Sequence, residues 1–423
     1  MSWEIDTLGK YSKVISGYAF KSDSFRTDNG IPIIKIKNIQ REYVEIDGEY
    51  FVDTSYLSLD PKFHCIKDDI LISLTGSHIT LPNSVVGRVA KYHYDFTSLL
   101  NQRGGKIVVT NPDKLENNYL YYYLCQNEIR IKLAQFGRGG ANQCNISPSN
   151  VESIPILLPP LETQKRIASI LSNYDDLIEN NLKRIKLLEE TAQNIYKEWF
   201  VNFRFPNYEH TEFDSESGLP VGWEIVALND IYDKLESGSR PKGGIDKDLK
   251  DGIPSIGAES IRELGYFDFS KTKFISNDFF EKMNKGKIED RDILIYKDGA
   301  YIGKTTLFQD DFPYSNCAVN EHVFLLNTKN KLHQYYLFFT LSTKEYYAKM
   351  QNLNSNAAQP GINQPKLLQL ELLMTNNENL LISFNDKVEP LVKQIYSLAK
   401  INKNLKEARD ILLPRLMNRT IEV

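Results

Sequence analysis

Loop side chains that could bind nucleic acid are the strongest chemical signal in this sequence. The segment FGRGGANQCN places Arg138 among glycines, where a backbone can approach a phosphate closely, and adds Asn142 and Gln143. Arginine pairs well with guanine, and asparagine or glutamine with adenine, at the major-groove edges of base pairs. We therefore predict that this loop contacts DNA.

Other segments carry side chains of the same kinds. NSNAAQPGINQPK, a second small and polar loop, holds Gln359 and Asn363, and SGSRPKGG places Arg240 and Lys242 in a flexible setting. Each of these side chains could equally be a solubilising surface group. The glutamine shared by the two loops favours the binding interpretation.

A basic segment, IKIKNIQR, extends this set. Alternate side chains of a β-strand share one face, so a strand here would present Lys35 and Lys37 together, with Asn38 beside them. We include these three residues among the candidate DNA contacts.

GAYIGKTT is the segment closest to a catalytic motif. A phosphate-binding loop requires a small residue five positions before its Gly-Lys pair, and here Asp298 stands there, with a carboxylate that would face phosphate. The flanking residues also indicate strand, turn and strand rather than strand, loop and helix. We predict no nucleotide site and retain Lys304 only as a candidate DNA contact.

Signatures of metal binding and acid–base catalysis are missing as well. The 6 histidines form no metal-ligand spacing, and only His322 is retained as a binding residue. The carboxylate pairs Asp68-Asp69 and Asp175-Asp176 are interpreted as solvated charges. We therefore expect a non-catalytic chain with no metal and no cofactor of its own.

Length and composition indicate more than one domain. The chain has 423 residues, 41% of them hydrophobic and 25% charged, and a net charge of −4. This length exceeds one ordinary core, and the acidic balance disfavours a free-standing nucleic-acid binder without excluding local basic loops. The chain shows no membrane span, no signal peptide and no paired cysteine motif, so we expect a cytoplasmic protein with reduced thiols.

Two long amphipathic segments must position the binding loops. The first, Leu161 to Phe200, contains neither Gly nor Pro, and its apolar residues recur in alternating steps of four and three. That spacing is typical of a coiled-coil seam, and the helix would extend roughly 50 Å between Ile167 and Trp199 at ~1.5 Å per residue. The seam residues are Ile167, Leu171, Ile178, Asn181, Leu188 and Ile195.

The second amphipathic segment begins at Phe384 and repeats this spacing. Its seam residues are Val388, Leu391, Ile395, Asn402, Leu405 and Leu412. Each seam contains one asparagine, which can fix the register of a coiled coil at a cost in stability. Arg409 falls on the same stripe and could end the tightly packed part. We predict that the two helices pack as an antiparallel coiled coil, although each could instead belong to a separate core.

The sequence also contains an internal repeat. Trp3-Glu4-Ile5 recurs as Trp223-Glu224-Ile225, and Asp69-Ile70-Leu71-Ile72 recurs as Asp292-Ile293-Leu294-Ile295. Further matches follow in the same order, with offsets that drift between 216 and 223 residues. Matches in a fixed order with drifting offsets indicate a tandem duplication.

The expected fold class is α+β, with two β-rich modules separated by the two long helices and related as a pseudo-two-fold repeat. We expect strands within GIPIIKIKNI, DDILISL, GKIVVT, GIPSI, RDILIY and EHVFLLNT. One helix is expected in each module, over 117–136 and 333–350. The predicted segments are a first module at 1–158, a helix at 159–203, a linker at 204–222, a second module at 223–376 and a second helix at 377–423.

This organisation resembles the specificity (S) subunit of type I restriction-modification systems. IPILLPPLETQKRIASIL is similar to the start of that family's first spacer helix, and ARDILLPRLM to the end of its second. EWFVNFRFPNYE followed by GLPVGWEIVAL looks like the passage into its second target-recognition domain. NQRGGKIVV and NEHVFLL stand where the family usually has Asn-Gln-His, with Arg103 and Glu321 as departures. Arg103 is accordingly added to the candidate DNA contacts.

The resemblance implies a division of labour among subunits. Each target-recognition domain would read one half of a split double-stranded DNA target, and the coiled coil would set the length of the unread gap. Two methyltransferase (M) subunits would dock on the helices, and two restriction and translocase (R) subunits would join the full complex. S-adenosylmethionine, ATP and magnesium would belong to those partners.

Three other interpretations stay open. The chain could serve a related restriction class or a methylation-only complex, which would change its partners but not its role. It could be a coiled-coil protein–protein adaptor without sequence-specific DNA binding, which would show no preference for DNA sequence. It could also be an enzyme with a site assembled between modules, which would turn over substrate alone.

Overall fold

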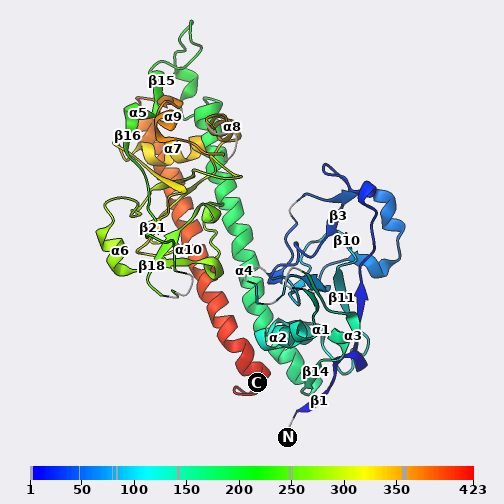
Figure 1. Cartoon of the computed structure of the whole chain (residues 1–423). Helices are drawn as coiled ribbons and strands as arrows, with labels where there is room; N and C mark the ends of the chain where they lie inside the picture. Colours follow the sequence, from blue (N-terminus) through cyan, green and yellow to red (C-terminus); the bar gives the residue numbers. More distant parts are fainter. Residues whose placement is uncertain are drawn as a thin grey trace. The chain divides into compact units, whose positions relative to one another are not determined.

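The structure is a computed structural model of the whole chain, and it describes residues 3–46, 48–78, 80–81, 84–140, 143–246, 249, 251–354 and 360–423. Internal contacts divide the chain into two units, the first formed by Met1–Asp176 with Lys406–Val423 and the second by Leu177–Leu405. Each unit therefore contains one β-rich module and a section of both long helices (Figure 1). The division into five segments stays a prediction.

The first module is built from short strands in several small sheets. A five-stranded sheet has the order β2-β11-β7-β9-β4, and a four-stranded sheet has the order β5-β3-β10-β6. The strands of these sheets are β2 (Ser12–Ser16), β3 (Ile31–Ile34), β4 (Glu42–Tyr43), β5 (Phe51–Val52), β6 (His64–Cys65), β7 (Ile70–Ser73), β9 (Val89–Lys91), β10 (Ser98–Leu100) and β11 (Gly104–Val109).

Two further sheets complete this module. β1 (Glu4–Thr7) pairs antiparallel with β14 (Pro155–Leu158). β12 (Arg138–Gly140) and β13 (Gln143–Asn145) form a hairpin whose second strand pairs with β8 (Thr75–Gly76). We expected a loop over GRGGANQCNISPSN, and for 138–140 and 143–145 that prediction was wrong, because main-chain pairing of β12 with β13 and of β13 with β8 orders these residues as strands. The helices are α1 (Asn117–Cys125), α2 (Asn127–Gln135) and α3 (Pro148–Glu152).

The second module repeats this plan. Its sheets have the orders β16-β22-β19-β20, β18-β17-β21 and β15-β23. Their strands are β15 (Trp223–Ala227), β16 (Tyr232–Ser237), β17 (Ile253–Ile256), β18 (Lys273–Ile275), β19 (Ile293–Tyr296), β20 (Thr305–Leu307), β21 (Ala318–Val319), β22 (Val323–Thr328) and β23 (Glu371–Thr375). The helices are α5 (Leu228–Ile231), α6 (Asn277–Lys282), α7 (His333–Leu341), α8 (Lys344–Asn352) and α9 (Gln364–Leu368).

Matching strand registers confirm the internal repeat. β3 pairs parallel with β10 through Ile34 and Leu100, and β17 pairs parallel with β21 through Ile256 and Val319. Gly30 and Gly252, which precede β3 and β17, both have positive φ angles, of 124° and 139°. Only glycine adopts that conformation readily, so the two halves have kept the same main-chain turn.

Each module contains two short helices where the sequence predicted one. α1 and α2 are separated at Gln126, whose φ and ψ of −61° and 134° are extended. α7 and α8 are separated before Thr343, whose side chain accepts a hydrogen bond from the amide of Tyr346 and caps α8. The prediction of a continuous helix was wrong in both modules: the extended main chain of Gln126 ends α1, and the Thr343 cap starts a new helix after α7.

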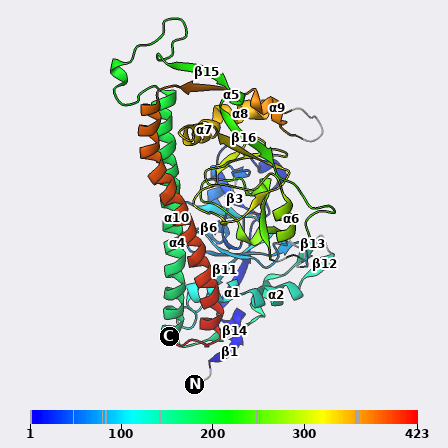
Figure 2. The same cartoon turned by 90° about the vertical axis from the view of Figure 1, so that its left-hand side faces the viewer.

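The two long helices pack side by side and antiparallel, as predicted (Figure 2). They are α4 (Leu161–Tyr196), continued by a π-helical turn at Lys197–Val201, and α10 (Glu378–Met417). In the first unit Ile167 and Leu171 of α4 lie in one hydrophobic cluster with Leu416 of α10. In the second unit Ile185 of α4 shares a cluster with Ile395 of α10.

Polar residues interrupt both seams in buried positions. Asn181 and Asn402 are buried and bond to each other in the second unit. The other seam residues of α4 are Ile178, which is buried, and Leu188 and Ile195, which are partly buried. In α10, Val388 is buried, while Leu391, Leu405 and Leu412 are partly exposed.

Arg409 lies inside the first unit and does not simply end the seam. Its side chain is 7% exposed and pairs with Asp175 of α4 at 2.5 Å and with Glu42 of β4. Tyr122 of α1 donates a hydrogen bond to the other oxygen of Asp175 at 2.6 Å. The interpretation of Asp175 as a solvated charge was therefore wrong, since a buried guanidinium requires carboxylate partners.

Candidate nucleic-acid interface

One edge of the first module gathers the ends of four neighbouring strands. The parallel strands β3 and β10 end side by side, and the chain then passes through Asn101–Arg103 into β11. Ser73 at the end of β7 pairs with Gly104 at the start of β11, and β8 follows at once. The β12–β13 hairpin joins this edge through β8. The topology thus brings Lys35, Arg103, Arg138 and Gln143 to one edge.

The arginines of this edge are available to a ligand. Arg103 and Arg138 are exposed, and within the described part of the chain neither guanidinium has a hydrogen-bond or ion-pair partner. Gln143, five residues after Arg138 on β13, is exposed as well. Asn142, the fourth candidate, lies outside the described residues. Two unpaired guanidinium groups beside an amide suit contacts to phosphate or to guanine.

The segment after β3 is a turn, so the predicted strand through Lys35 and Lys37 was wrong. The amide of Lys35 donates to Asn38 Oδ1 at 2.9 Å, and Asn38 Nδ2 donates to the carbonyl of Glu45 at 2.8 Å. Asn38 is buried, so its side chain holds the turn and does not contact DNA. Lys35 lies over the ring of Tyr50 at 3.1 Å, and Lys37 pairs with Glu49.

The equivalent edge of the second module holds a cluster of charged side chains. Arg240 pairs with Glu321 at 2.5 Å. His322 lies between two carboxylates, with Nδ1 3.3 Å from Asp298 and Nε2 3.3 Å from Glu321. Arg240 and His322 are therefore brought together, as two cationic or ionisable groups among acidic partners.

Sequence reasoning missed the acidic half of this cluster. Asp298 forms a β-bridge with Gly361 in the way that Thr75 pairs with Asn145 in the first module. Glu259 pairs with Lys273 and lies close enough to His322 for the imidazole to act on the pKa of its carboxyl. Aligning the two halves at the repeat offset would have placed Asp298 and Glu259 at this edge.

The remaining candidates of the second module have no hydrogen bond or ion pair to the charged side chains of this cluster among the contacts described, or lie outside the described residues. Lys304 stands in a turn between β19 and β20, as the strand-turn-strand prediction requires, and pairs with Glu263 at 3.1 Å. Lys242 is exposed. Asn363 caps α9, with Oδ1 accepting a hydrogen bond from the amide of Lys366 at 2.9 Å. Gln359 lies outside the described residues.

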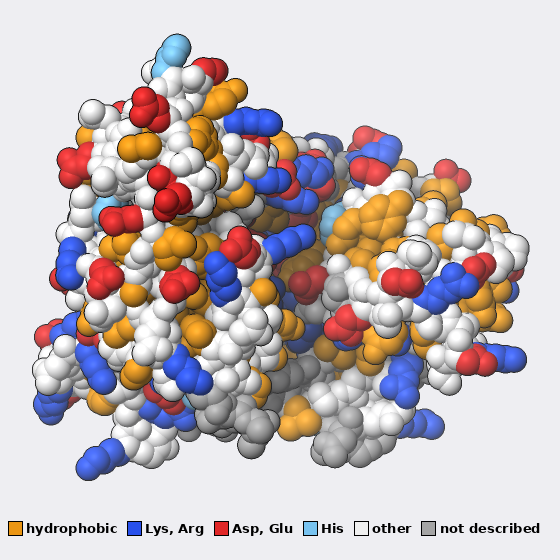
Figure 3. All heavy atoms as spheres, turned by 90° about the horizontal axis from the view of Figure 1, so that it is seen from above, with side chains coloured by type: hydrophobic (Ala, Val, Ile, Leu, Met, Phe, Trp, Pro, Cys, Tyr) orange, Lys and Arg blue, Asp and Glu red, His pale blue; other side chains and the backbone are white. Residues whose placement is uncertain are grey.

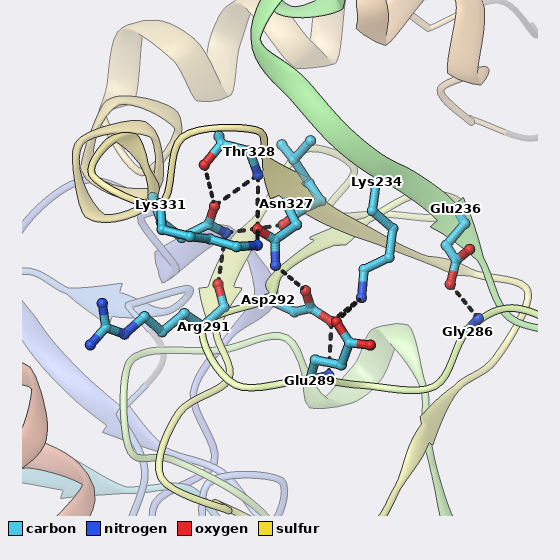
Figure 4. Close-up of polar contacts among 11 residues, drawn as sticks. Lys234, Glu236, Gly286, Glu289, Arg291, Asp292, Asn327, Thr328 and Lys331 are labelled. Atoms are coloured by element: carbon cyan, nitrogen blue, oxygen red, sulfur yellow. Dashed lines mark hydrogen bonds and ion pairs between the residues drawn. The ribbon is translucent and has the colours of Figure 1, made fainter.

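An aspartate directly before a strand supports the sheet of each module, Asp292 before β19 and Asp69 before β7. Asp292 is buried, and the Asp69 side chain is 19% exposed. Asp292 accepts from Lys234 at 2.8 Å, from Asn327 at 2.8 Å and from the amide of Glu289 at 2.9 Å (Figure 4). Its counterpart Asp69 accepts from the amide of Ile66 at 2.9 Å and pairs with Lys106. Burial raises the pKa of both carboxyls, against the effect of the neighbouring ammonium.

These contacts correct one more prediction. Asp69 was interpreted as a solvated charge, but it is a structural partner of the buried Lys106, whereas Asp68 is exposed. The cations differ between modules, because Lys106 stands on β11 and Lys234 stands on β16. Both modules have thus kept the aspartate that holds the turn, but the lysine that pairs with this carboxylate comes from a different strand in each module.

Charges on the surface are mixed. In the face shown in Figure 3, Lys and Arg side chains are interspersed with Asp and Glu side chains and do not form one continuous basic field. Within the described residues no group of three or more His, Cys, Asp and Glu side chains is arranged to hold a metal ion. None of the helices in that part of the chain has the length and apolar character needed to cross a membrane.

Comparison with known proteins identifies the repeated module. The sequence profile described as "Type I restriction modification DNA specificity domain" matches residues 2–190 and 220–374. The chain is 26% identical over 420 residues to the putative type I restriction enzyme MjaX specificity subunit of Methanocaldococcus jannaschii, covering 98% of this chain and 92% of that protein. It is 28% identical over 329 residues to the MjaIX specificity subunit of the same organism, covering 72% of this chain and 69% of that protein.

A solved structure has the same fold. The chain is similar to the crystal structure of a type I restriction-modification system S subunit from M. genitalium, with a TM-score of 0.54 and 15% identity. The similarity covers 98% of this chain and 96% of that chain. At this identity the comparison concerns the fold, which includes two modules and two long helices.

Proposed function

Because the chain belongs to the type I restriction modification DNA specificity family, we propose that it is the DNA-recognition subunit of such a complex. Each module would read one half of a bipartite duplex target. The antiparallel helices α4 and α10 would carry the two readers and set the length of the unread gap between their half-sites.

The observation that supports this proposal is a repeated framework with different side chains at equivalent edges. The main chain hydrogen bond from Leu74 N to Arg103 O recurs as Lys297 N to His322 O, both at 3.0 Å. The side chains at these positions nevertheless differ in charge and size. A shared scaffold with divergent edge residues suits two readers of two different base sequences.

In the first module the proposed contacts are Arg103, Arg138 and Gln143, with Lys35 and Lys37 close to the phosphate backbone. In the second they are Arg240 and His322, with Lys242 and Lys304 as further basic side chains. Arginine would bind guanine or phosphate, and glutamine would bind adenine. The net charge of −4 suggests that additional phosphate contacts come from basic partner subunits.

Catalysis would be left to other subunits. Methyl transfer with S-adenosylmethionine and ATP-driven translocation with magnesium would belong to two M and two R subunits, and the paired helices would dock the M subunits. The chain itself would change no substrate. Its contribution is to choose where on the duplex the partners act.

An exchange of modules tests this proposal. Residues 1–158 are replaced by the corresponding module of a relative, and the methylated or bound sites are mapped before and after in the assembled complex. We expect one half of the recognised site to change while the other half stays the same. The reciprocal exchange of 223–376 is the matched control and should change only the other half.

Two outcomes would contradict the proposal. A change in both halves after one exchange would mean that the modules do not read independently. Binding without any preference for DNA sequence, by the unaltered chain in its assembly, would favour the coiled-coil adaptor instead.

A further inference from the structure

Four equivalent positions at the edges of the two modules carry opposite charge. Shared main-chain contacts define four pairs of equivalent positions in the two modules. They are Lys37 and Glu259, Thr75 and Asp298, Gln102 and Glu321, and Arg103 and His322. The first module's set has two cations and no carboxylate, whereas the second module's set has three carboxylates. The framework is the same, so the difference lies in the side chains alone.

The equivalence of Gln102 and Glu321 follows from their neighbours. Asn101 N donates to Ile34 O and Asn320 N donates to Ile256 O, both at 3.0 Å, at the ends of the paired parallel strands. Each strand end is closely approached by a glycine. A Cβ on Gly17 would lie 2.4 Å from the carbonyl oxygen of Leu100, and one on Gly238 would lie 1.6 Å from that of Val319. The following residue therefore occupies the same place in both modules.

Glu321 is not a saturated structural carboxylate. One oxygen, Oε1, receives both Arg240 and His322, and the other, Oε2, is enclosed without a hydrogen-bond partner. The partner Arg240 is itself 46% exposed, and the Glu321 side chain is 32% exposed. Because Arg240 is accessible, a donor on a ligand can take its place at Oε1, the oxygen of Glu321 that is not enclosed.

A carboxylate at a DNA interface repels phosphate, so it is useful only where the duplex offers it a donor. The major groove offers such donors as the exocyclic amino groups of cytosine and adenine, and carboxylates accept from cytosine N4. The same carboxylate disfavours a base that presents a carbonyl oxygen at that place, which adds discrimination by repulsion.

Resting on the DNA-recognition function proposed above, we propose that Glu321 determines specificity in the second half-site by accepting a hydrogen bond from the exocyclic amino group of a base. Arg240, which Glu321 holds in the free protein, is thereby released to the DNA backbone. The second module thus gains selectivity from the carboxylate of Glu321, at the position where the first module has the amide side chain of Gln102.

The first experiment locates the base. The full-length chain in its assembly selects binding sites from a random duplex library, and Glu321→Gln is compared with wild type. We expect Glu321→Gln to lose about 5- to 150-fold of the discrimination at one position of the second half-site, the range for a single base contact. Glu345→Gln, which removes an exposed carboxylate paired with Lys349 on α8, should select the wild-type site.

The second experiment tests the amino group itself. At the located position, the adenine or cytosine is replaced by purine or 2-pyrimidinone, which lack the exocyclic amino group. Wild type should bind the substituted duplex more weakly than the natural duplex. The factor should be about the same as the factor by which Glu321→Gln binds the natural duplex more weakly than wild type does. Glu321→Gln should be nearly insensitive to the replacement, since the two changes remove one shared contact.

The outcomes separate this inference from the function on which it rests. The assignment of Glu321 is overturned if wild type selects a bipartite site and Glu321→Gln selects the same bases at every position. It is also overturned if the losses of affinity caused by the mutation and by the base analogue add in full. If wild type selects no sequence at all, it is the DNA-recognition function that fails. Arg240→Ala should keep the base preference. The slope of log K against the logarithm of salt concentration should become less steep by about 0.9, because one phosphate contact is lost.

Discussion

Asn181 Nδ2 donates a hydrogen bond to Asn402 Oδ1 at 2.8 Å, and this contact joins α4 to α10 in the middle of an apolar seam. Asn402 Nδ2 also lies 3.4 Å from the carbonyl oxygen of Ile178. Both asparagines are buried, so the contact pairs the Asn181 amide donor with the Asn402 acceptor inside the seam. A buried pair of this kind stabilises one register of the helices over its neighbours.

Replacing one asparagine should cost more than replacing both. Asn402→Leu leaves the Asn181 amide buried without its partner, and we expect the free energy of unfolding to fall by about 1–3 kcal/mol. Asn181→Leu/Asn402→Leu should recover most of that loss, because two apolar side chains continue the seam. Urea denaturation of the three proteins measures this, and additive losses would show that the asparagines do not act as a pair.

Removing Arg409 should destabilise the first unit strongly. Arg409→Met leaves the half-buried carboxylates of Asp175 and Glu42 without their cation. The expected loss is about 3–5 kcal/mol of unfolding free energy, as for other buried ion pairs with one partner removed. Lys165→Met, which removes an exposed pair with Glu162, is the control and should cost less than about 1 kcal/mol. Equal losses in the two variants would contradict a buried role for Arg409.

Glu189 should make stability fall between about pH 4.5 and pH 7. Burial raises the pKa of this carboxyl to about 7 from its usual value of 4.5, so the folded state holds a proton that the unfolded state has already lost. Stability is then greatest below the unfolded pKa and decreases as pH rises through the folded pKa.

Glu189→Gln tests this dependence. The variant should be more stable than wild type at pH 8, by up to about 3 kcal/mol, and should differ little near pH 4.5. Thermal unfolding across this range measures the difference, and Glu190→Gln, a more exposed neighbour, should follow wild type. A difference that grows as pH falls would have the wrong sign.

Gly238 should tolerate no side chain. A Cβ there would lie 1.6 Å from the carbonyl oxygen of Val319, so the crossing of two main chains would have to open. We expect Gly238→Ala to cost at least about 2 kcal/mol. Gly244→Ala is the control for space, because a Cβ there meets nothing within 4 Å. Unlike Gly238, Gly244 has a positive φ, so this variant should lose only about 1 kcal/mol, to main-chain strain. Similar melting temperatures for both variants would contradict the steric explanation.

A matched deletion tests whether the helices set the gap. Residues 178–184 and 399–405 face each other around the Asn181–Asn402 contact, and removing seven residues from each helix keeps both seams in phase. Each helix shortens by about 10 Å, so the gap between half-sites should shorten by about three base pairs while the bases read stay the same. Site mapping that finds the original gap would show that the helices are not the spacer.

The edges that could bind DNA were only partly predictable. Arg103, Arg138, Arg240 and His322 are indeed at strand ends or on a hairpin at the module edges, because loops that follow strands collect there. Asn38 shows the opposite case. Its amide holds a turn, and nothing in its residue type distinguishes a structural asparagine from a base-reading one.

Periodicity and repetition, read along the chain, determined the two long helices and the duplication, and the segments at the helix ends resemble those of the family. Those signals are local or recur at a fixed offset, so no knowledge of distant contacts is needed to detect them. Tertiary structure alone decided which charges are solvated and which are paired. Asp175, Asp69 and Arg409 are polar on any sequence scale, yet each is drawn into a buried pair by a partner far away in the chain. The energy of a charge depends on what surrounds it, and only the folded packing of both units provides those surroundings.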